Sequence, residues 1–352
     1  MTYSTNPYVL QFGVEPNQFI PRKDETQKIE NSFFTEGISQ QCFMITGVRG
    51  SGKTVFMTNL AEKCKDLGWF VINLNISSDL SLFQQIVDSF EQQEILHIHD
   101  GINTIGINVM GIGAQVTKSS KTISAEFRVK QLFKQAEKKN LKILITIDEV
   151  INTDFMKAFA GAFQIWIREK LPVYLLMTGL YENIRKLQDD KTLTFLYRCP
   201  RIDLGPLSMQ AIQSNYKNIL NVNNTVAIEM TKLTKGYSFA FQVLGYIVWE
   251  HKSLNQDTLD EYKNTLASLS YEKIWDELSN NDRKLCTAIA QSNNGSIEEI
   301  KNIMNCTNSQ LAPYRKRLIE KQIVTGKRRG YLTFTLPLFE EFVLDANEYD
   351  FW

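Results

Sequence analysis

Eight consecutive residues near the start of the chain have the types and spacing of a phosphate-binding loop. They run Gly47-Val48-Arg49-Gly50-Ser51-Gly52-Lys53-Thr54. In such a loop, successive backbone N–H groups curl round an anion at a helix N-terminus, and glycine is needed where the backbone approaches closely. Lys53 is placed to reach the β- and γ-phosphates of a nucleotide, and the Thr54 hydroxyl to coordinate Mg²⁺. The segment from Gly47 to Val55 therefore predicts a site for ATP with Mg²⁺, rather than a glycine turn beside an ordinary lysine.

An acidic pair supplies the other half of this predicted site. The apolar or β-branched run 144–147 ends at Asp148-Glu149. Because such folds bind ligands at the carboxyl ends of their strands, Asp148 is expected to hold Mg²⁺ and its waters, and Glu149 to polarise an attacking water. Thr178 follows the strand expected over 173–177 and is placed to hydrogen-bond the γ-phosphate or that water. Two alternatives stay open: the acidic pair opens a solvated loop, and Thr178 only caps its strand.

A parallel sheet is needed to bring these groups together, and the periodicity of the chain predicts one. Apolar runs without helical spacing predict strands over 41–46, 69–75, 141–147, 172–177 and 202–204. Apolar residues at helical spacing predict helices over 54–67, 82–90, 127–138 and 155–170, with Asp79 as the cap of the second. Residues 98–117 interleave glycine with Ile and Val, which predicts an inserted β-hairpin. The βαβ order indicates an α/β domain.

After Gly205-Pro206 the strand signals stop. Helices are expected over 209–220, 226–233, 239–249 and 259–269. Three further helices, over 285–290, 297–304 and 311–321, precede a strand, basic turn and strand over 323–336, which is a winged-helix pattern. The predicted organisation is a P-loop NTPase domain with a parallel sheet flanked by helices over 1–205, a small all-helical lid over 206–275, and a winged helix-turn-helix domain over 276–352.

Composition limits the partners. The 352 residues carry 39 Lys plus Arg against 39 Asp plus Glu, so any nucleic-acid site has to be local. The five cysteines are far apart, and His97 and His99 lack a third ligand nearby, so we expect buried reduced thiols and no zinc. The start has no signal segment, and no apolar run reaches the roughly 18 residues of a membrane helix, so a cytoplasmic protein without a membrane partner is expected.

A local excess of positive charge occurs in the last predicted domain. Around the expected recognition helix 311–321 and the following turn lie Arg315, Lys316, Arg317, Lys321, Lys327, Arg328 and Arg329, while the acidic segment 340–350 offsets much of this charge. These residues suit phosphate contacts around a helix in the major groove, so we expect binding to duplex DNA. The alternative is a winged helix that contacts protein. Pro313 fits the helix only if it starts near Ser309 or Gln310.

These features, in their order along the chain, resemble the AAA+ ATPases of the origin-recognition type, especially the prokaryotic ones with a C-terminal winged helix. Besides the P-loop and the acidic pair, the resemblance rests on Asn6-Pro7-Tyr8, Phe12-Gly13, Pro21-Arg22, Met177-Thr178-Gly179, Tyr197-Arg198-Cys199-Pro200-Arg201 and Lys235-Gly236-Tyr237-Ser238-Phe239-Ala240. The resemblance implies an ATP-binding sheet domain, a helical lid and nucleotide-dependent DNA binding.

The resemblance also assigns roles to single positions. Arg198, with Arg201 as the alternative, resembles the arginine that acts on a neighbouring subunit's γ-phosphate, which implies self-association. Phe239 stands where the family often has a second sensor arginine, and Ser238 where related signalling ATPases have a proline near adenine. We therefore expect an ATP-binding, slowly hydrolysing switch that binds DNA, with a nucleotide-gated signalling or defence-type scaffold as the alternative. A GTPase is disfavoured, because no Asn-Lys-x-Asp pattern occurs.

Overall fold

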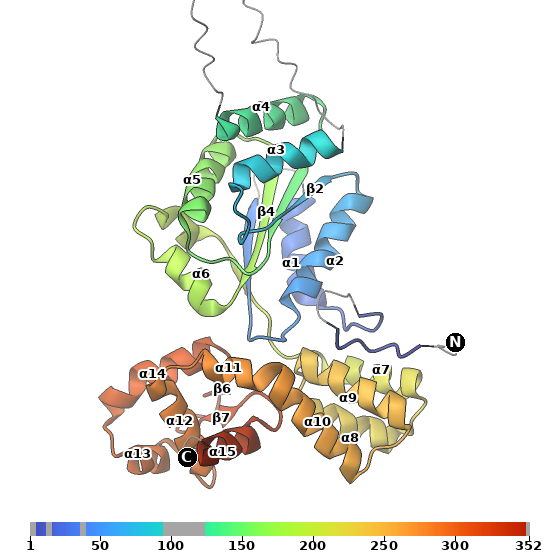
Figure 1. Cartoon of the computed structure of the whole chain (residues 1–352), viewed down its shortest axis with the longest axis vertical. Helices are drawn as coiled ribbons and strands as arrows, with labels where there is room; N and C mark the ends of the chain where they lie inside the picture. Colours follow the sequence, from blue (N-terminus) through green and yellow to red (C-terminus); the bar gives the residue numbers. More distant parts are fainter. Residues whose placement is uncertain (1–4, 12–15, 36–39, 94–123, 350–352) are drawn as a thin grey trace, which may run out of the picture.

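The first part of the chain folds into a five-stranded sheet with helices on both faces, seen in the upper half of Figure 1. The computed structural model describes residues 5–11, 16–35, 40–93 and 124–349. The strands are β1 Cys42–Thr46, β2 Phe70–Leu74, β3 Ile143–Ile147, β4 Val173–Gly179 and β5 Arg201–Asp203, each within two residues of its predicted range. All neighbouring pairs are parallel. The predicted α/β fold class is confirmed.

The order of the strands decides which side chains meet. Across the sheet the order is β2-β3-β4-β1-β5, so β4 lies between the strand that precedes the P-loop and the strand that precedes the acidic pair. Thr46 at the end of β1 is in register with Gly179 of β4, and Ile147 at the end of β3 with Met177. The three strands therefore reach the carboxyl edge of the sheet together, which is where ligands bind in open α/β sheets.

Helices cover the two faces unequally. One face packs against α1 Lys23–Phe33 and α2 Lys53–Asp66, and the other against α3 Leu82–Gln92, α4 Ala125–Lys138, α5 Asp154–Arg168 and α6 Tyr181–Gln188. The core of the second face centres on Trp166, whose ring packs edge-on against Phe133 at a centroid distance of 4.9 Å. The predicted cap of α3, Asp79, is wrong, because the adjacent Ser81 accepts the bond from the Gln84 N–H.

The second part of the chain is an all-helical lid, at the lower right of Figure 1. It consists of α7 Met209–Leu220, α8 Asn224–Thr234, α9 Ser238–His251 and α10 Gln256–Leu266. These helices match the predicted ones, and α7 does so to the residue. After α10 the chain continues through a π-helical turn, Ala267–Tyr271, into the short helix α11 Glu272–Asp276.

The third part contains the predicted three helices and two strands. They are α12 Asn280–Gln291, α13 Ile297–Met304, α14 Asn308–Glu320, β6 Val324–Thr325 and β7 Thr333–Phe334, followed by α15 Phe339–Tyr349. α14 begins at Asn308, one residue before the predicted start near Ser309 or Gln310, because Thr307 and Gln310 form a capping box. Pro313 therefore lies in the second turn and not in the first. Within the acidic segment, residues 340–349 belong to α15, which packs against α12.

Several elements have no counterpart in the sequence prediction. They are α1, α6, α11, α15 and the 3-10 helix η1 Thr194–Arg198. The hairpin expected over 98–117, the pair His97 and His99, and the Phe12-Gly13 segment lie outside the described residues. Of the five free cysteines, Cys199 and Cys306 are only partly buried. In the described ranges no helix is long and apolar enough to cross a bilayer.

Tyr8 ties the start of the chain to the lid. Its ring lies so close to Gly245 of α9 that an added Cβ would be 2.5 Å from two ring carbons. Gly245→Ala should therefore displace Tyr8 and lower the free energy of unfolding by about 1–3 kcal/mol, measured by urea denaturation. Gly161→Ala is the matched control, because Gly161 is in helix α5 with nothing within 4 Å of the added Cβ. It should raise stability by up to about 1 kcal/mol, and equal midpoints for the two variants would contradict this packing.

Candidate active site

The predicted phosphate loop connects β1 to α2, and its backbone depends on two glycines. Gly50 has φ +75° and Gly52, the N-cap of α2, has φ +86°. Both values lie in the left-handed region, where a side chain is strained. The loop thus presents the N-terminus of a 14-residue helix at the carboxyl edge of the sheet, with the positive end of the helix dipole toward it.

Lys53 closes the loop on itself. Its Nζ donates hydrogen bonds to the carbonyl oxygens of Gly47, at 3.1 Å, and Val48, at 3.2 Å. Burial lowers the pKa of Lys53 to about 8, against the opposing attraction of Asp148 and Glu149. An anion bound beside Lys53 would therefore raise this pKa and keep the side chain protonated.

Asp148 joins the three strand ends. Its Oδ2 accepts a hydrogen bond of 2.7 Å from Thr54 Oγ1, and its Oδ1 accepts one from the buried hydroxyl of Thr178. The Thr54 and Asp148 oxygens that are paired here are the hard donors that Mg²⁺ prefers. The structure thus brings Lys53, Thr54, Asp148 and Thr178 together around one carboxylate.

Glu149, the next residue, has a backbone conformation that is rare for residues other than glycine. Its φ is +49°, in the left-handed region, which costs a non-glycine residue about 1–2 kcal/mol. Its N–H donates to Asp148 Oδ1 at 3.0 Å and to Thr178 Oγ1 at 3.2 Å, and these bonds hold the turn. The side chain is exposed beside the cluster. Local strain of this kind is common at functional sites, and nothing in the residue order predicts it.

Residues of the lid and of the N-terminal segment form hydrogen bonds with the backbone carbonyls of the phosphate loop. Arg22 is buried, and its guanidinium donates to Ser51 O at 2.9 Å, Gly205 O at 2.7 Å and Ser238 Oγ at 3.2 Å. Tyr237 Oη donates to Arg49 O at 2.7 Å, so a Cβ on Gly50 would lie 2.2 Å from that hydroxyl. The sequence analysis assigned no role to Arg22 or Tyr237, which occurred only within segments that resemble the family.

The other predicted positions have no hydrogen bond or ion pair with Asp148 in the described ranges. Phe239 contacts the loop through its N–H, which donates to Gly50 O at 3.1 Å. Arg198 is exposed at the end of η1, and Arg201 pairs with Asp203 at 2.9 Å and lies over the Tyr181 ring. In the described part of the chain, neither arginine forms a hydrogen bond or ion pair with the P-loop, Asp148 or Glu149.

The seven basic residues predicted to contact DNA fall into two groups. Arg317 pairs with the buried Asp282 at 2.7 Å, and Lys321, whose side chain is 11% exposed, pairs with Glu182 at 3.1 Å. These two cations are engaged within the molecule. Lys316 is exposed on α14, Arg315 is partly buried, and the turn residues Lys327, Arg328 and Arg329 are exposed. Only part of the predicted set is thus available to a partner.

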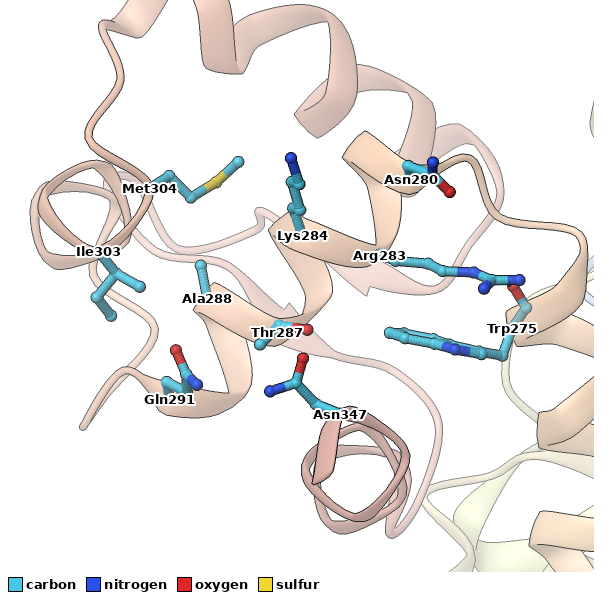
Figure 2. A pocket seen from close by; sticks show the side chains of 10 residues that line it. All are labelled: Trp275, Asn280, Arg283, Lys284, Thr287, Ala288, Gln291, Ile303, Met304 and Asn347. Atoms are coloured by element: carbon cyan, nitrogen blue, oxygen red, sulfur yellow. The ribbon is translucent and has the colours of Figure 1, made fainter. Parts of the chain in front are cut away.

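A hollow of about 430 Å³ lies in the C-terminal domain between α12, α13 and α15 (Figure 2). Arg283 lies over the Trp275 ring, 5.3 Å from its centroid, and is held there by a bond of 3.0 Å from Nε to Trp275 O. The hollow is lined by Trp275, Asn280, Arg283, Lys284, Thr287, Ala288, Gln291, Ile303, Met304 and Asn347. This lining has no carboxylate, so it lacks the acidic Mg²⁺ ligand that Asp148 offers beside the P-loop.

Comparison with known proteins places the fold. Residues 269–343 match a family model described as a domain of unknown function (DUF8462), and no curated protein matches the chain. The structure is similar to the Walker-type ATPase of Pyrococcus abyssi, at 13% identity and a TM-score of 0.67 over 96% of this chain and 99% of that one.

Two further solved structures are similar over 97% of this chain and 97% of their own. They are the ORC2 protein of Aeropyrum pernix in its ADPNP and ADP complexes, at 14% identity and a TM-score of 0.59, and Cdc6p from Pyrobaculum aerophilum, at 15% and 0.50. The chain therefore shares its fold with this Walker-type ATPase and with the ORC2 and Cdc6 proteins over nearly its whole length, and this is the fold that the sequence resemblance implied.

The lowered pKa of Lys53 has a measurable consequence. Near pH 8 about half of the free protein should carry a neutral Lys53, and a bound triphosphate should raise this pKa, so ATP binding should take up about half a proton. The uptake should vanish below pH 6.5, where Lys53 is already charged. Isothermal titration in two buffers with different ionisation enthalpies measures it. Lys53→Arg is the control, because arginine stays protonated. The same proton uptake in both proteins would contradict the assignment.

Proposed function

We propose that this protein binds ATP with Mg²⁺ at the P-loop and hydrolyses it slowly, as a switch that controls DNA binding by its C-terminal domain. The observation that carries the proposal is the convergence of Thr54 and Thr178 on the Asp148 carboxylate, next to Lys53. The similarity to an ORC2 protein solved with ADPNP and ADP supports the choice of an adenine nucleotide.

Each group has a distinct role in the proposal. The backbone N–H groups of Gly47 to Val55 and the Lys53 ammonium bind the phosphates, and Thr54 and Asp148 hold Mg²⁺. A metal ion held there would supply positive charge to offset the negative charge that develops during hydrolysis. Thr178 orients the γ-phosphate or the attacking water, and Glu149 accepts a proton from that water.

Slow turnover follows from what the lid supplies. Phe239 has no cationic side chain to stabilise transition-state charge, and the nearby Arg22 already donates to three oxygens. The remaining arginine of the proposal, Arg198, is exposed and would act on the nucleotide of a second copy. Turnover should therefore depend on self-association.

Two substitutions separate binding from hydrolysis. Lys53→Ala should weaken ATP affinity by about a hundredfold, because a charge-assisted phosphate contact is lost. Glu149→Gln should keep the affinity and lower turnover by about a hundredfold or more. Fluorescence anisotropy with labelled ATP and a phosphate-release assay measure the two effects. A Lys53→Ala protein that still bound ATP tightly would refute the central claim.

DNA binding is proposed for the exposed basic residues of α14 and of the turn between β6 and β7. Lys327, Arg328 and Arg329 are exposed, and Arg328 lies 3.8 Å from the centroid of the Tyr331 ring, which orders it. Lys316 is exposed on the adjacent helix. Together these cations suit the phosphate backbone of duplex DNA.

Replacement of the three turn residues tests this part of the proposal. Lys327→Ala, Arg328→Ala and Arg329→Ala together should weaken duplex binding and reduce the slope of log affinity against log salt by about three. The matched control replaces three exposed lysines of the sheet domain, Lys134, Lys138 and Lys139, and should leave the slope unchanged. Gel-shift titrations over a salt series measure both. Equal slopes for the two triple variants would exclude DNA binding through the turn.

A second candidate function is a nucleotide-gated scaffold whose C-terminal domain contacts protein. The observation in its favour is that Arg317 and Lys321 form ion pairs with Asp282 and Glu182. Part of the basic surface of α14 therefore serves contacts within the molecule. Nucleotide-dependent oligomers without affinity for duplex DNA would favour this candidate.

A further inference from the structure

One residue of the phosphate loop forms an ion pair with the C-terminal half of the chain. Arg49 Nη2 lies 2.7 Å from Oε1 of Glu277, the residue that ends α11. The two side chains are 34% and 30% exposed, so the pair is only partly screened by water. Arg49 Nε is buried and finds no hydrogen-bond partner among the described residues. The pair with Glu277 therefore leaves one donor of the guanidinium unsatisfied.

The backbone of Arg49 is fixed by the same part of the molecule. Its carbonyl accepts from Tyr237 Oη at 2.7 Å, and that hydroxyl is also 2.7 Å from Ser270 Oγ in the π-helical turn before α11. The side chain of Arg49 thus contacts the segment that connects the lid to the C-terminal domain directly, through Glu277, and its backbone is linked to that segment through Tyr237. A movement of this segment must change the environment of the loop.

Glu277 is also linked to α14. Its carbonyl oxygen accepts a bond of 3.2 Å from Lys321, which pairs with Glu182 of α6. A second pair, Arg185 with Glu320 at 3.4 Å, joins the same two helices, and Figure 1 shows α14 below α6. The end of α14 is thereby docked on the sheet domain, with Glu277 between it and the P-loop.

We propose that Glu277 competes with nucleotide phosphate for Arg49, so that ATP binding and docking of the C-terminal domain oppose each other. The inference rests on the proposed ATP binding and adds a means of regulation to it. A triphosphate carries more negative charge than one carboxylate and accepts several hydrogen bonds, so it can draw Arg49 away from Glu277. Loss of this pair frees the segment that carries Glu277 and weakens the hold on Lys321.

Linkage makes the effect reciprocal and gives its size. If ATP weakens the docking, the docking must weaken ATP binding by the same factor. A partly exposed ion pair contributes modestly, so the factor is about two- to fivefold in affinity. The Arg49–Glu277 ion pair therefore lowers the affinity for ATP as long as the C-terminal domain stays docked.

A double-mutant cycle tests the competition. With Mg²⁺ and labelled ATP, Glu277→Gln should bind about two- to fivefold more tightly than the wild type. In the Arg49→Ala background, Glu277→Gln should change nothing, because the residue competed for is gone. Glu272→Gln, at an exposed position of the same helix, is the control and should bind like the wild type.

The outcomes distinguish this inference from the proposed function. An unchanged or weaker affinity for Glu277→Gln, or an equal gain in the Arg49→Ala background, would overturn the competition while ATP binding stands. A wild type that binds ATP no better than Lys53→Ala would overturn the proposed function itself.

Hydrogen exchange supplies a second readout that does not depend on affinity. Saturating ATP should speed amide exchange in the last turns of α14 in the wild type, because Lys321 loses part of its hold. Glu277→Gln should show the faster exchange without ATP. An α14 that exchanges at the same rate in all these states would overturn the proposal.

Discussion

The carboxylate of Asp148 is the group on which the arrangement of the candidate site depends. It accepts from Thr54 at the start of α2 and from Thr178 at the end of β4, and it stabilises the left-handed turn at Glu149. These contacts are possible only because β4 lies between β1 and β3. One carboxylate thus links the ends of β3 and β4 to the start of α2, and it positions Thr54, Thr178 and the backbone of Glu149.

The loop itself is held from behind by parts of the chain that are remote in sequence. Arg22 donates to the backbone carbonyl of Ser51, and Tyr237 to that of Arg49. Gly50 allows Tyr237 to approach, since any Cβ there would overlap the hydroxyl. The glycine therefore serves both the turn and the contact with the lid, and the lid forms one wall of the site.

The C-terminal domain shows how charge that is clustered in sequence can be divided in space. Arg317 forms an ion pair with Asp282, and Lys321 forms one with Glu182. The basic side chains of the turn between β6 and β7 are exposed. The lid and this domain also share one apolar core, so a change at α11 is transmitted to both. Ion pairs of α14 with α6 and of Arg49 with Glu277 then connect this unit to the sheet domain.

The sequence by itself determined the local features. Apolar runs located the five strands, helical spacing located most helices, and the glycine and lysine spacing located the loop, because these signals depend on near neighbours. Only the tertiary structure decided that Arg49 meets Glu277, 228 positions away, and that α14 docks on α6. It also decided which basic residues stay exposed. Ion pairs between distant segments depend on how whole domains pack, and no periodicity in the chain encodes that.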